Sequence, residues 1–172
     1  MAVAIVTGAG SGIGAATARA LAFRGDDVVC ADVVLDAATR TADTLTSAMA
    51  VKVDVSSGAS CDEMVAKTVE RFGRVDIVVT CAGVEKHGAG HEFSEEDFDR
   101  IIAVNLKGTW LSARSAVNAM IRGGHGGTVV MIGSINSVVG NPGASAYCAS
   151  KGGVLMLGKT LALDWAPFGI RV

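Results

Sequence analysis

Short apolar runs alternate with amphipathic segments along the whole chain. The runs are rich in Val, Ile and Ala and predict buried strands over residues 2–7, 27–31, 50–53, 75–80, 128–132 and 170–172. The segments between them place apolar residues at helical spacing and predict helices over residues 15–23, 35–47, 57–72, about 94–121 and 146–165. Alternating strands and helices predict a doubly wound parallel sheet in a three-layer α/β/α arrangement.

No linker or change of composition divides the 172 residues, so we expect a single domain over residues 1–172. The net charge of −2 gives no attraction to nucleic acid or to an anionic membrane, and no apolar run is long enough for a membrane span. The N-terminal residues lack the basic region of a signal peptide. Four scattered cysteines without a Cys-x-x-Cys pair predict free thiols, a cytoplasmic location and no metal site.

A glycine-rich turn separates the first predicted strand from the first predicted helix. In that context the glycines let the main chain approach a dinucleotide pyrophosphate, which would lie at the helix N-terminus. The residues of this turn expected to bind the cofactor are Gly8, Ser11, Gly12, Ile13 and Gly14. Asp32 closes the second strand, where its carboxylate could accept hydrogen bonds from ribose hydroxyls and would repel a 2′-phosphate, so NAD is expected rather than NADP. The alternative is a turn with a structural role only.

The only tyrosine of the chain, Tyr147, precedes Lys151 by four residues. On a helix this spacing places both side chains on one face. A nearby ammonium stabilises a phenolate, so such a pair could exchange a proton with an alcohol or carbonyl oxygen. Ser134 precedes this helix and its hydroxyl could bind the same oxygen. Taken alone, the pair also fits an ordinary polar face of an amphipathic helix.

Taken together, these motifs resemble the short-chain dehydrogenase/reductase family, and the resemblance covers the whole chain. Residues 7–14, Thr-Gly-Ala-Gly-Ser-Gly-Ile-Gly, resemble the family's Thr-Gly-x-x-x-Gly-x-Gly cofactor motif. Asp54 and Val55 resemble its adenine-contacting pair after the third strand. Residues 80–83, Thr-Cys-Ala-Gly, resemble its Asn-Asn-Ala-Gly segment, with Thr and Cys in place of the two asparagines.

The catalytic tetrad of the family is matched by Asn105, Ser134, Tyr147 and Lys151. The resemblance implies an NAD-dependent oxidoreductase that transfers a hydride between the cofactor and a secondary alcohol or ketone. It implies that Tyr147 is the acid/base, that Lys151 binds the nicotinamide ribose and that Ser134 holds the substrate oxygen. Asn105 would support a water that links Lys151 to solvent. The cofactor contacts implied beyond the glycine turn are Asp54, Val55, Ala82, Gly83, Asn105, Tyr147 and Lys151.

Members of this family usually continue beyond the strand predicted at residue 170, with a substrate-covering loop and a final strand. This chain is therefore expected to lack both parts, either as a fragment or as a naturally shortened form. The missing part supports a competing interpretation, a non-catalytic dinucleotide-binding or assembly module. Residues 84–93 and 136–144 are expected to line the remaining substrate pocket, and the lack of an Arg cluster there favours a neutral alcohol as the small-molecule substrate.

The two longest predicted helices, over residues 95–121 and 146–165, carry more apolar residues than one sheet-facing stripe needs. Residues 154–157 are apolar all round the helix, so part of this run would be exposed on a monomer. The family resemblance implies the same contact, because its members generally pair these two helices with their symmetry mates. We therefore expect a homodimer or homotetramer. The alternative is that a further C-terminal segment covers this surface.

Overall fold

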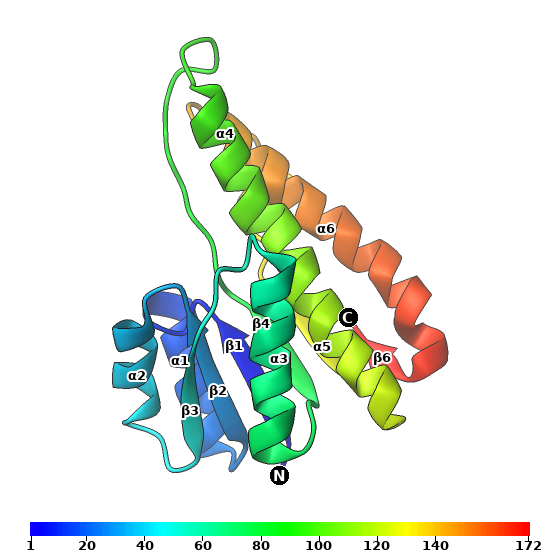
Figure 1. Cartoon of the computed structure of the whole chain (residues 1–172). Helices are drawn as coiled ribbons and strands as arrows, with labels where there is room; N and C mark the ends of the chain where they lie inside the picture. The colour runs from blue at the N-terminus through cyan, green and yellow to red at the C-terminus, as the bar shows by residue number, and fades with distance from the viewer.

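A computed structural model describes all 172 residues and contains one six-stranded parallel sheet in the order β3-β2-β1-β4-β5-β6 (Figure 1). The strands are β1 Val3–Thr7, β2 Asp27–Asp32, β3 Ala48–Lys52, β4 Ile77–Thr80, β5 Gly127–Met131 and β6 Ile170–Arg171. The helices are α1 Gly12–Phe23, α2 Leu35–Ala42, α3 Gly58–Phe72, α4 Glu95–Ile101, α5 Gly108–Gly123 and α6 Ser145–Trp165. The strand order reverses between β1 and β4, where ligands of such sheets usually bind. The predicted fold class is confirmed.

Side chains of the central strands alternate between two apolar cores, one on each face of the sheet. On β1, Ile5 belongs to the core beneath α3 and α5, whereas Val6 belongs to the core beneath α1 and α2. Ile5 is fully buried and pairs in register with Val29 of β2 and Val78 of β4. The core beneath α1 and α2 is built from small residues such as Ala18, which brings these helices close to the strands.

The predicted helix over residues 35–47 is wrong in its last turn, because α2 ends at Ala42. The Thr44 hydroxyl donates a 2.7 Å hydrogen bond to the Thr41 carbonyl oxygen, and the Ser47 hydroxyl binds the Asp27 carboxylate. A hydroxyl that bonds locally, as that of Thr44 does, competes with the helical ladder, whereas the Ser47 bond ties the chain to a residue 20 positions earlier. The chain therefore turns after α2 and enters β3 at Ala48, two residues earlier than predicted.

The long helix predicted over residues 94–121 is present but not uniform. A π-helical segment, Ile102–Lys107, joins α4 to α5 and places one extra residue in the turn. The segment is followed by Gly108, at which a Cβ would lie 2.7 Å from the Val55 side chain, so only glycine allows this approach. Helical insertions of this kind often occur at functional sites, and this one contains Asn105.

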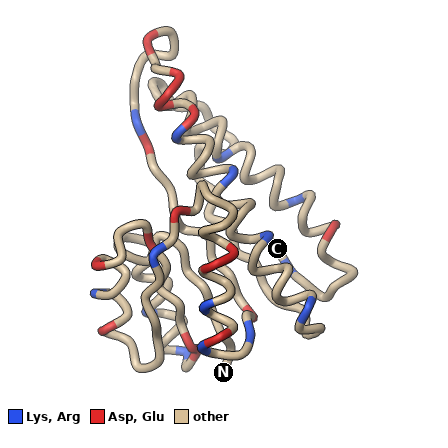
Figure 2. Tube along the Cα trace, in the orientation of Figure 1, with Lys and Arg blue, Asp and Glu red and all other residues tan.

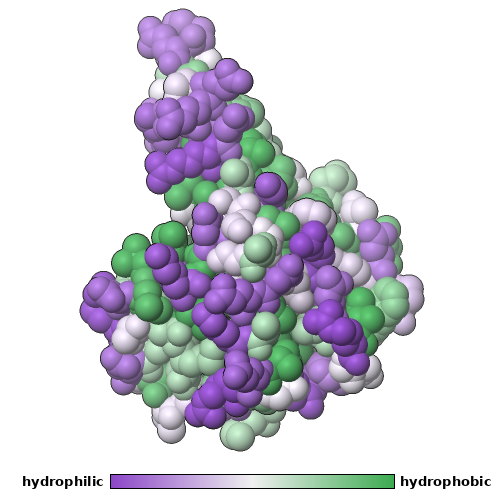
Figure 3. Space-filling view, in the orientation of Figure 1, coloured by the Kyte–Doolittle hydropathy of each residue, from purple (hydrophilic) through white to green (hydrophobic).

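The outer ends of α4 and α6 project together beyond the edge of the sheet (Figure 1). Polar residues cover the tip of α4, where its first turn carries three acidic side chains (Figure 3). Acidic and basic residues are otherwise interspersed over the trace (Figure 2). On α6, Met156 and Leu163 are 60% and 77% exposed, which confirms that part of its apolar surface is left in solvent. No helix of the chain is long and apolar enough to cross a membrane.

Candidate dinucleotide-binding and catalytic site

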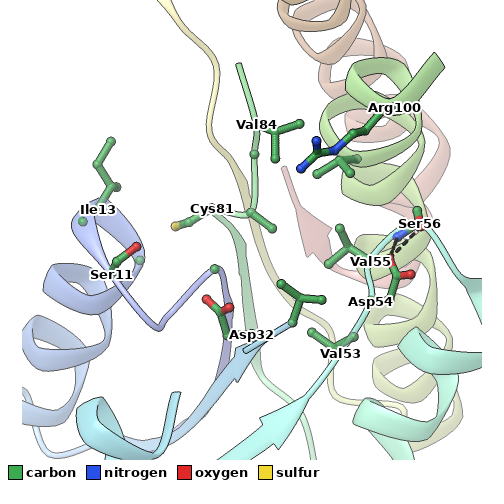
Figure 4. A pocket seen from close by; sticks show the side chains of 17 residues that line it. Ser11, Ile13, Asp32, Val53, Asp54, Val55, Ser56, Cys81, Val84 and Arg100 are labelled. Carbon is green, nitrogen blue, oxygen red and sulfur yellow. Dashed lines mark hydrogen bonds between the residues drawn. The ribbon is translucent and has the colours of Figure 1, made fainter. Parts of the chain in front are cut away.

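The carboxyl ends of the first four strands surround a cavity of about 590 Å³ (Figure 4). Its wall includes every residue predicted from the glycine turn, Asp32, the Asp54–Val55 pair and the Ala82–Gly83 pair. Its lining residues are Gly8, Ser11, Gly12, Ile13, Gly14, Asp32, Val33, Val53, Asp54, Val55, Ser56, Cys81, Ala82, Gly83, Val84, Arg100 and Val104. The volume lies in the ordinary range for small-molecule and cofactor sites.

The N-terminus of α1 faces this cavity, and its capping groups are not used by the protein itself. Ser11 is the N-cap residue, but its side chain makes no capping hydrogen bond, and the first turn carries no acidic residue. The first main-chain N–H groups of a helix lack internal partners and carry a partial positive charge. This end of α1 is therefore suited to an anionic group such as a pyrophosphate.

The structure gives different reasons for a glycine at positions 14 and 12 of the turn. A Cβ at Gly14 would lie 2.6 Å from the Gly8 carbonyl carbon and would overlap its oxygen, so Gly14 is required by the packing of the turn itself. Gly12 has φ +49°, and a Cβ there would meet no protein atom within 4 Å. Gly12 also lines the cavity, so the residues present leave open space for a phosphate group beside the start of α1.

Asp32 ties the glycine turn to the end of β2. Its Oδ2 accepts a 2.9 Å hydrogen bond from the Gly10 N–H, and its Oδ1 accepts a 3.0 Å bond from the Val34 N–H. These bonds fix the carboxylate at the cavity wall and leave each oxygen able to accept another hydrogen bond. Arg100 is the only basic residue of the wall, and in Figure 4 it lies on the opposite side of the cavity from Asp32.

Asp54 and Ser56 form a local turn on the wall after β3. The Asp54 Oδ1 accepts hydrogen bonds from the Ser56 N–H at 2.9 Å and from the Ser56 hydroxyl at 2.6 Å (Figure 4). The next residue, Ser57, caps α3 by accepting from the Ser60 N–H. The turn and the cap together hold the segment that was predicted to face an adenine ring.

Tyr147 and Lys151 lie on one face of α6, as their spacing predicts. The Lys151 Nζ is 5.8 Å from the centre of the Tyr147 ring and donates a 2.7 Å hydrogen bond to the Ile132 carbonyl oxygen at the end of β5. Lys151 is only 6% exposed, and this burial lowers the pKa of its ammonium below the ordinary value of 10.5. Lysine is rarely buried in this way, and a buried cation beside a tyrosine ring marks a candidate functional site.

Ser134 caps the short 3-10 turn Ile135–Ser137, which precedes α6. Its hydroxyl accepts a 3.1 Å hydrogen bond from the Asn136 N–H, and the Ser137 hydroxyl accepts from the Ser134 N–H. The Asn136 amide in turn donates to the Cys148 thiol at 3.2 Å, which fastens this turn to the residue beside Tyr147. No hydrogen bond joins the Ser134 and Tyr147 hydroxyls directly.

Asn105 is fully buried in the π segment, and its side chain is committed to protein partners. Its Oδ1 accepts from the Val84 N–H at 2.8 Å, and its Nδ2 donates to the Val84 carbonyl oxygen at 2.9 Å and to the Ser150 hydroxyl at 3.1 Å. The Asn105 main-chain oxygen accepts from the Thr109 hydroxyl at 2.7 Å. A relay water at Asn105 would therefore have to use a remaining lone pair of one of these oxygens.

The predicted residues thus divide into two neighbouring groups. The glycine turn, Asp32 and the segments after β3 and β4 line the cavity, whereas Asn105, Ser134, Tyr147 and Lys151 do not. Ser134 instead borders a second depression of about 460 Å³ beside α6. Val84, from the segment expected to line the substrate pocket, lies on the wall of this cavity. The residues of the wall that were not predicted are Val33, Val53, Ser56, Cys81, Arg100 and Val104. For Arg100 and Val104 a signal existed, because their spacing of four places them on one helical face next to Asn105.

Comparisons with known proteins agree with this architecture. The family model for short chain dehydrogenases matches residues 2–172. A 2-(R)-hydroxypropyl-CoM dehydrogenase of Xanthobacter autotrophicus is 41% identical over 177 residues, which cover 98% of this chain and 70% of that protein. An uncharacterized NAD-dependent oxidoreductase of Mycobacterium tuberculosis is 37% identical over 187 residues, which cover 99% of this chain and 68% of that protein.

Among solved structures, a sorbitol-6-phosphate 2-dehydrogenase from Erwinia amylovora superposes with a TM-score of 0.94 at 38% identity. The match covers 98% of this chain and 68% of that one. A family match over almost the whole sequence, relatives above 30% identity and a shared fold agree with one another. The chain belongs to the short-chain dehydrogenase/reductase family of oxidoreductases.

Proposed function

We propose that this chain is the dinucleotide-binding and catalytic part of an NAD-dependent dehydrogenase that interconverts a neutral secondary alcohol and a ketone. The observation that carries the proposal is the buried Lys151 ammonium on the same helical face as the only tyrosine of the chain. The uncapped N-terminus of α1 in the cavity supports the cofactor part of the proposal. The relatives support the reaction class, since one is named for the oxidation of a hydroxypropyl group and another is named NAD-dependent.

Different residues of the cavity would bind different parts of the cofactor. The first N–H groups of α1 would bind the pyrophosphate, Asp32 the adenosine ribose, and the segment with Asp54 and Val55 the adenine. Asp32 favours NAD, because a 2′-phosphate beside it would meet a carboxylate, and the one basic residue of the cavity, Arg100, lies on the opposite side. The Ala82–Gly83 pair would form the wall toward Asn105, Tyr147 and Lys151.

Proton transfer is the part of the reaction assigned to the protein's own side chains. When bound, the nicotinamide supplies the hydride acceptor or donor. Tyr147 would exchange a proton with the substrate oxygen through its hydroxyl, which has no hydrogen-bond partner in the protein. Lys151 would stabilise the phenolate and bind the nicotinamide ribose, and Ser134 would orient the substrate oxygen. Asn105 would support the water that connects Lys151 to solvent.

Two measurements on the purified chain test this proposal. Fluorescence titration with NADH and NADPH should show tighter binding of NADH. Turnover is then assayed with NAD and a panel of neutral secondary alcohols, beside a full-length relative as a positive control. Tighter NADPH binding would contradict the cofactor assignment. NADH binding with no turnover on substrates that the relative oxidises would instead support a non-catalytic dinucleotide-binding or assembly module.

We also propose that the chain forms a homodimer or homotetramer through α4–α5 and α6. An open apolar groove runs between these helices, and its lining includes Leu106, Trp110, Gly153, Met156 and Leu157. Placing the same groove of a second copy over it would remove these side chains from water in a two-fold contact. Light scattering should give a dimer or larger for the wild type and a monomer for Leu157→Glu.

The matched control for the assembly test is Phe23→Glu, because Phe23 is 96% exposed at the end of α1, outside the groove. This variant should keep the assembly of the wild type. A monodisperse wild-type monomer at micromolar concentration, with or without NAD, would contradict the interface.

A further inference from the structure

Ser150 lies between two residues of the proposed tetrad and has no assigned role. It sits on α6 one position before Lys151, and it is fully buried. Its hydroxyl contacts Asn105 Nδ2 at 3.1 Å and the Tyr147 carbonyl oxygen at 2.7 Å. A single hydroxyl thus joins the π segment to the helical turn that carries Tyr147.

The direction of each hydrogen bond in this network follows from the chemistry of the partners. The Val84 N–H can only donate and the Val84 carbonyl oxygen can only accept, so the Asn105 amide must point Oδ1 to the first and Nδ2 to the second. The second Nδ2 hydrogen then points to Ser150, which must accept it. The Ser150 proton is left for the Tyr147 carbonyl oxygen.

The resulting chain of bonds runs from Val84 through Asn105 and Ser150 to Tyr147. Val84 lines the dinucleotide cavity, so one end of the chain is the cavity wall and the other is the turn of the proposed acid/base. The bond from Ser150 to the carbonyl three residues earlier is common in helices. The bond from Asn105 is different, because it connects residues 45 positions apart on two helices.

We propose that Ser150 is a positioning residue, which couples the cavity wall at Val84 to the Tyr147 turn through the Asn105 amide. Without the Ser150 hydroxyl, one buried Nδ2 hydrogen loses its acceptor, and the Asn105 amide is held by Val84 alone. The amide can then rotate, which loosens its bond to the Val84 N–H. The consequence for turnover rests on the function proposed above, whereas the coupling between Ser150 and Val84 does not.

Amide hydrogen exchange at Val84 tests the coupling without any need for activity. Ser150 has no hydrogen bond with Val84, so Ser150→Ala can affect this amide only through Asn105. The exchange rate of the Val84 N–H is compared with that of Val78, a fully buried β4 residue whose exchange follows global stability. We expect Ser150→Ala to raise the ratio of Val84 to Val78 exchange about tenfold, the factor for roughly one hydrogen bond.

The matched control is Ser112→Ala on α5. Ser112 is also fully buried, but its hydroxyl contacts only the Cys61 thiol at 3.6 Å, away from Asn105. This variant should leave the exchange ratio unchanged. An unchanged ratio in Ser150→Ala would overturn the proposal, as would an equal rise in both variants.

If the wild-type chain is active, steady-state kinetics test the effect of Ser150 on catalysis. Ser150→Ala should lower kcat about tenfold while the Kd for NADH stays within about twofold, because the glycine turn, Asp32 and the segment after β3 are unchanged. An active Ser150→Ala enzyme with wild-type kcat would overturn the positioning role. If the wild type has no turnover, the proposed function fails, and the Val84 exchange ratio still decides whether Ser150 couples the two elements.

Discussion

Replacing Gly12 by alanine separates the cost of backbone strain from the loss of cofactor binding. Gly12 has φ +49°, a conformation that costs an L-residue about 1–2 kcal/mol. For a chain of this length, that cost lowers the Tm by roughly 2–8 °C. The new methyl group meets no protein atom, so the fold should survive. The methyl enters the space where the pyrophosphate would lie, and NADH affinity should fall at least about tenfold.

Two further variants provide comparisons for Gly12→Ala. Gly124→Ala carries the same kind of strain, with φ +68° and open space around the new Cβ, but lies at the end of α5 outside the cavity. It should lose the same few degrees of Tm and keep wild-type NADH affinity. Gly14→Ala should destabilise the fold more than either, because its methyl overlaps the Gly8 main chain. The assays are thermal denaturation and NADH fluorescence titration. Wild-type NADH affinity in Gly12→Ala would refute the pyrophosphate site.

Three other outcomes follow from the geometry of the site. Asp32→Ala combined with Val33→Arg should raise NADPH affinity relative to NADH at least about tenfold in parallel titrations; an unchanged preference would contradict the role of Asp32. Burial lowers the pKa of Lys151 in the folded state below the 10.5 of the unfolded chain. The buried ammonium therefore destabilises the fold at pH values below the folded-state pKa, and this destabilisation disappears as the pH rises toward 10.5. Lys151→Met should therefore be more stable than wild type at pH 7, with a difference that shrinks by pH 10 in denaturant titrations; a variant less stable at both pH values would contradict this. Burial also raises the pKa of the Cys81 thiol, so a thiol reagent should label Cys81 slowly in a Cys148→Ser background. Because Cys81 lines the cavity, saturating NADH should block this labelling. Equal labelling rates with and without NADH would count against the cavity as the cofactor site.

The order of strands and helices could be predicted because apolar periodicity is strong where both faces of the sheet are buried. All five residues of β1, Val3–Thr7, are buried, and such runs have few alternatives. The end of α2 was missed because it coincides with a local bond of Thr44 and with a bond from Ser47 to the distant Asp27, and a helical pattern does not report either of them. Element ends of this kind depend on side-chain bonds that appear only once the partners are placed.

The π segment could not be predicted, because its sequence, Ile-Ala-Val-Asn-Leu-Lys, has ordinary helical character. Its stability comes from contacts between distant residues, such as Asn105 with Val84 and Ser150, and Gly108 with Val55. The contacts of Ser150 could not be predicted for the same reason, because a serine within a helix carries no signal in the sequence for a distant partner. By contrast, the glycine turn and Asp32 were predictable although they are 22 positions apart, because a glycine-rich turn between a strand and a helix, followed by an acidic residue at the end of the next strand, is a recognisable sequence pattern.

The Tyr147→Phe variant tests the central claim most directly, because it removes one hydroxyl from the only tyrosine of the chain. That hydroxyl makes no hydrogen bond within the protein, so the fold and the NADH affinity should be nearly unchanged. Loss of a general acid/base typically costs 10²- to 10⁴-fold in rate, and turnover should fall by about that factor. The measurement is kcat for an alcohol that the wild type oxidises, made beside an NADH titration of both proteins. A large loss of kcat with unchanged NADH affinity is the predicted result, and near-wild-type kcat in Tyr147→Phe would contradict the account.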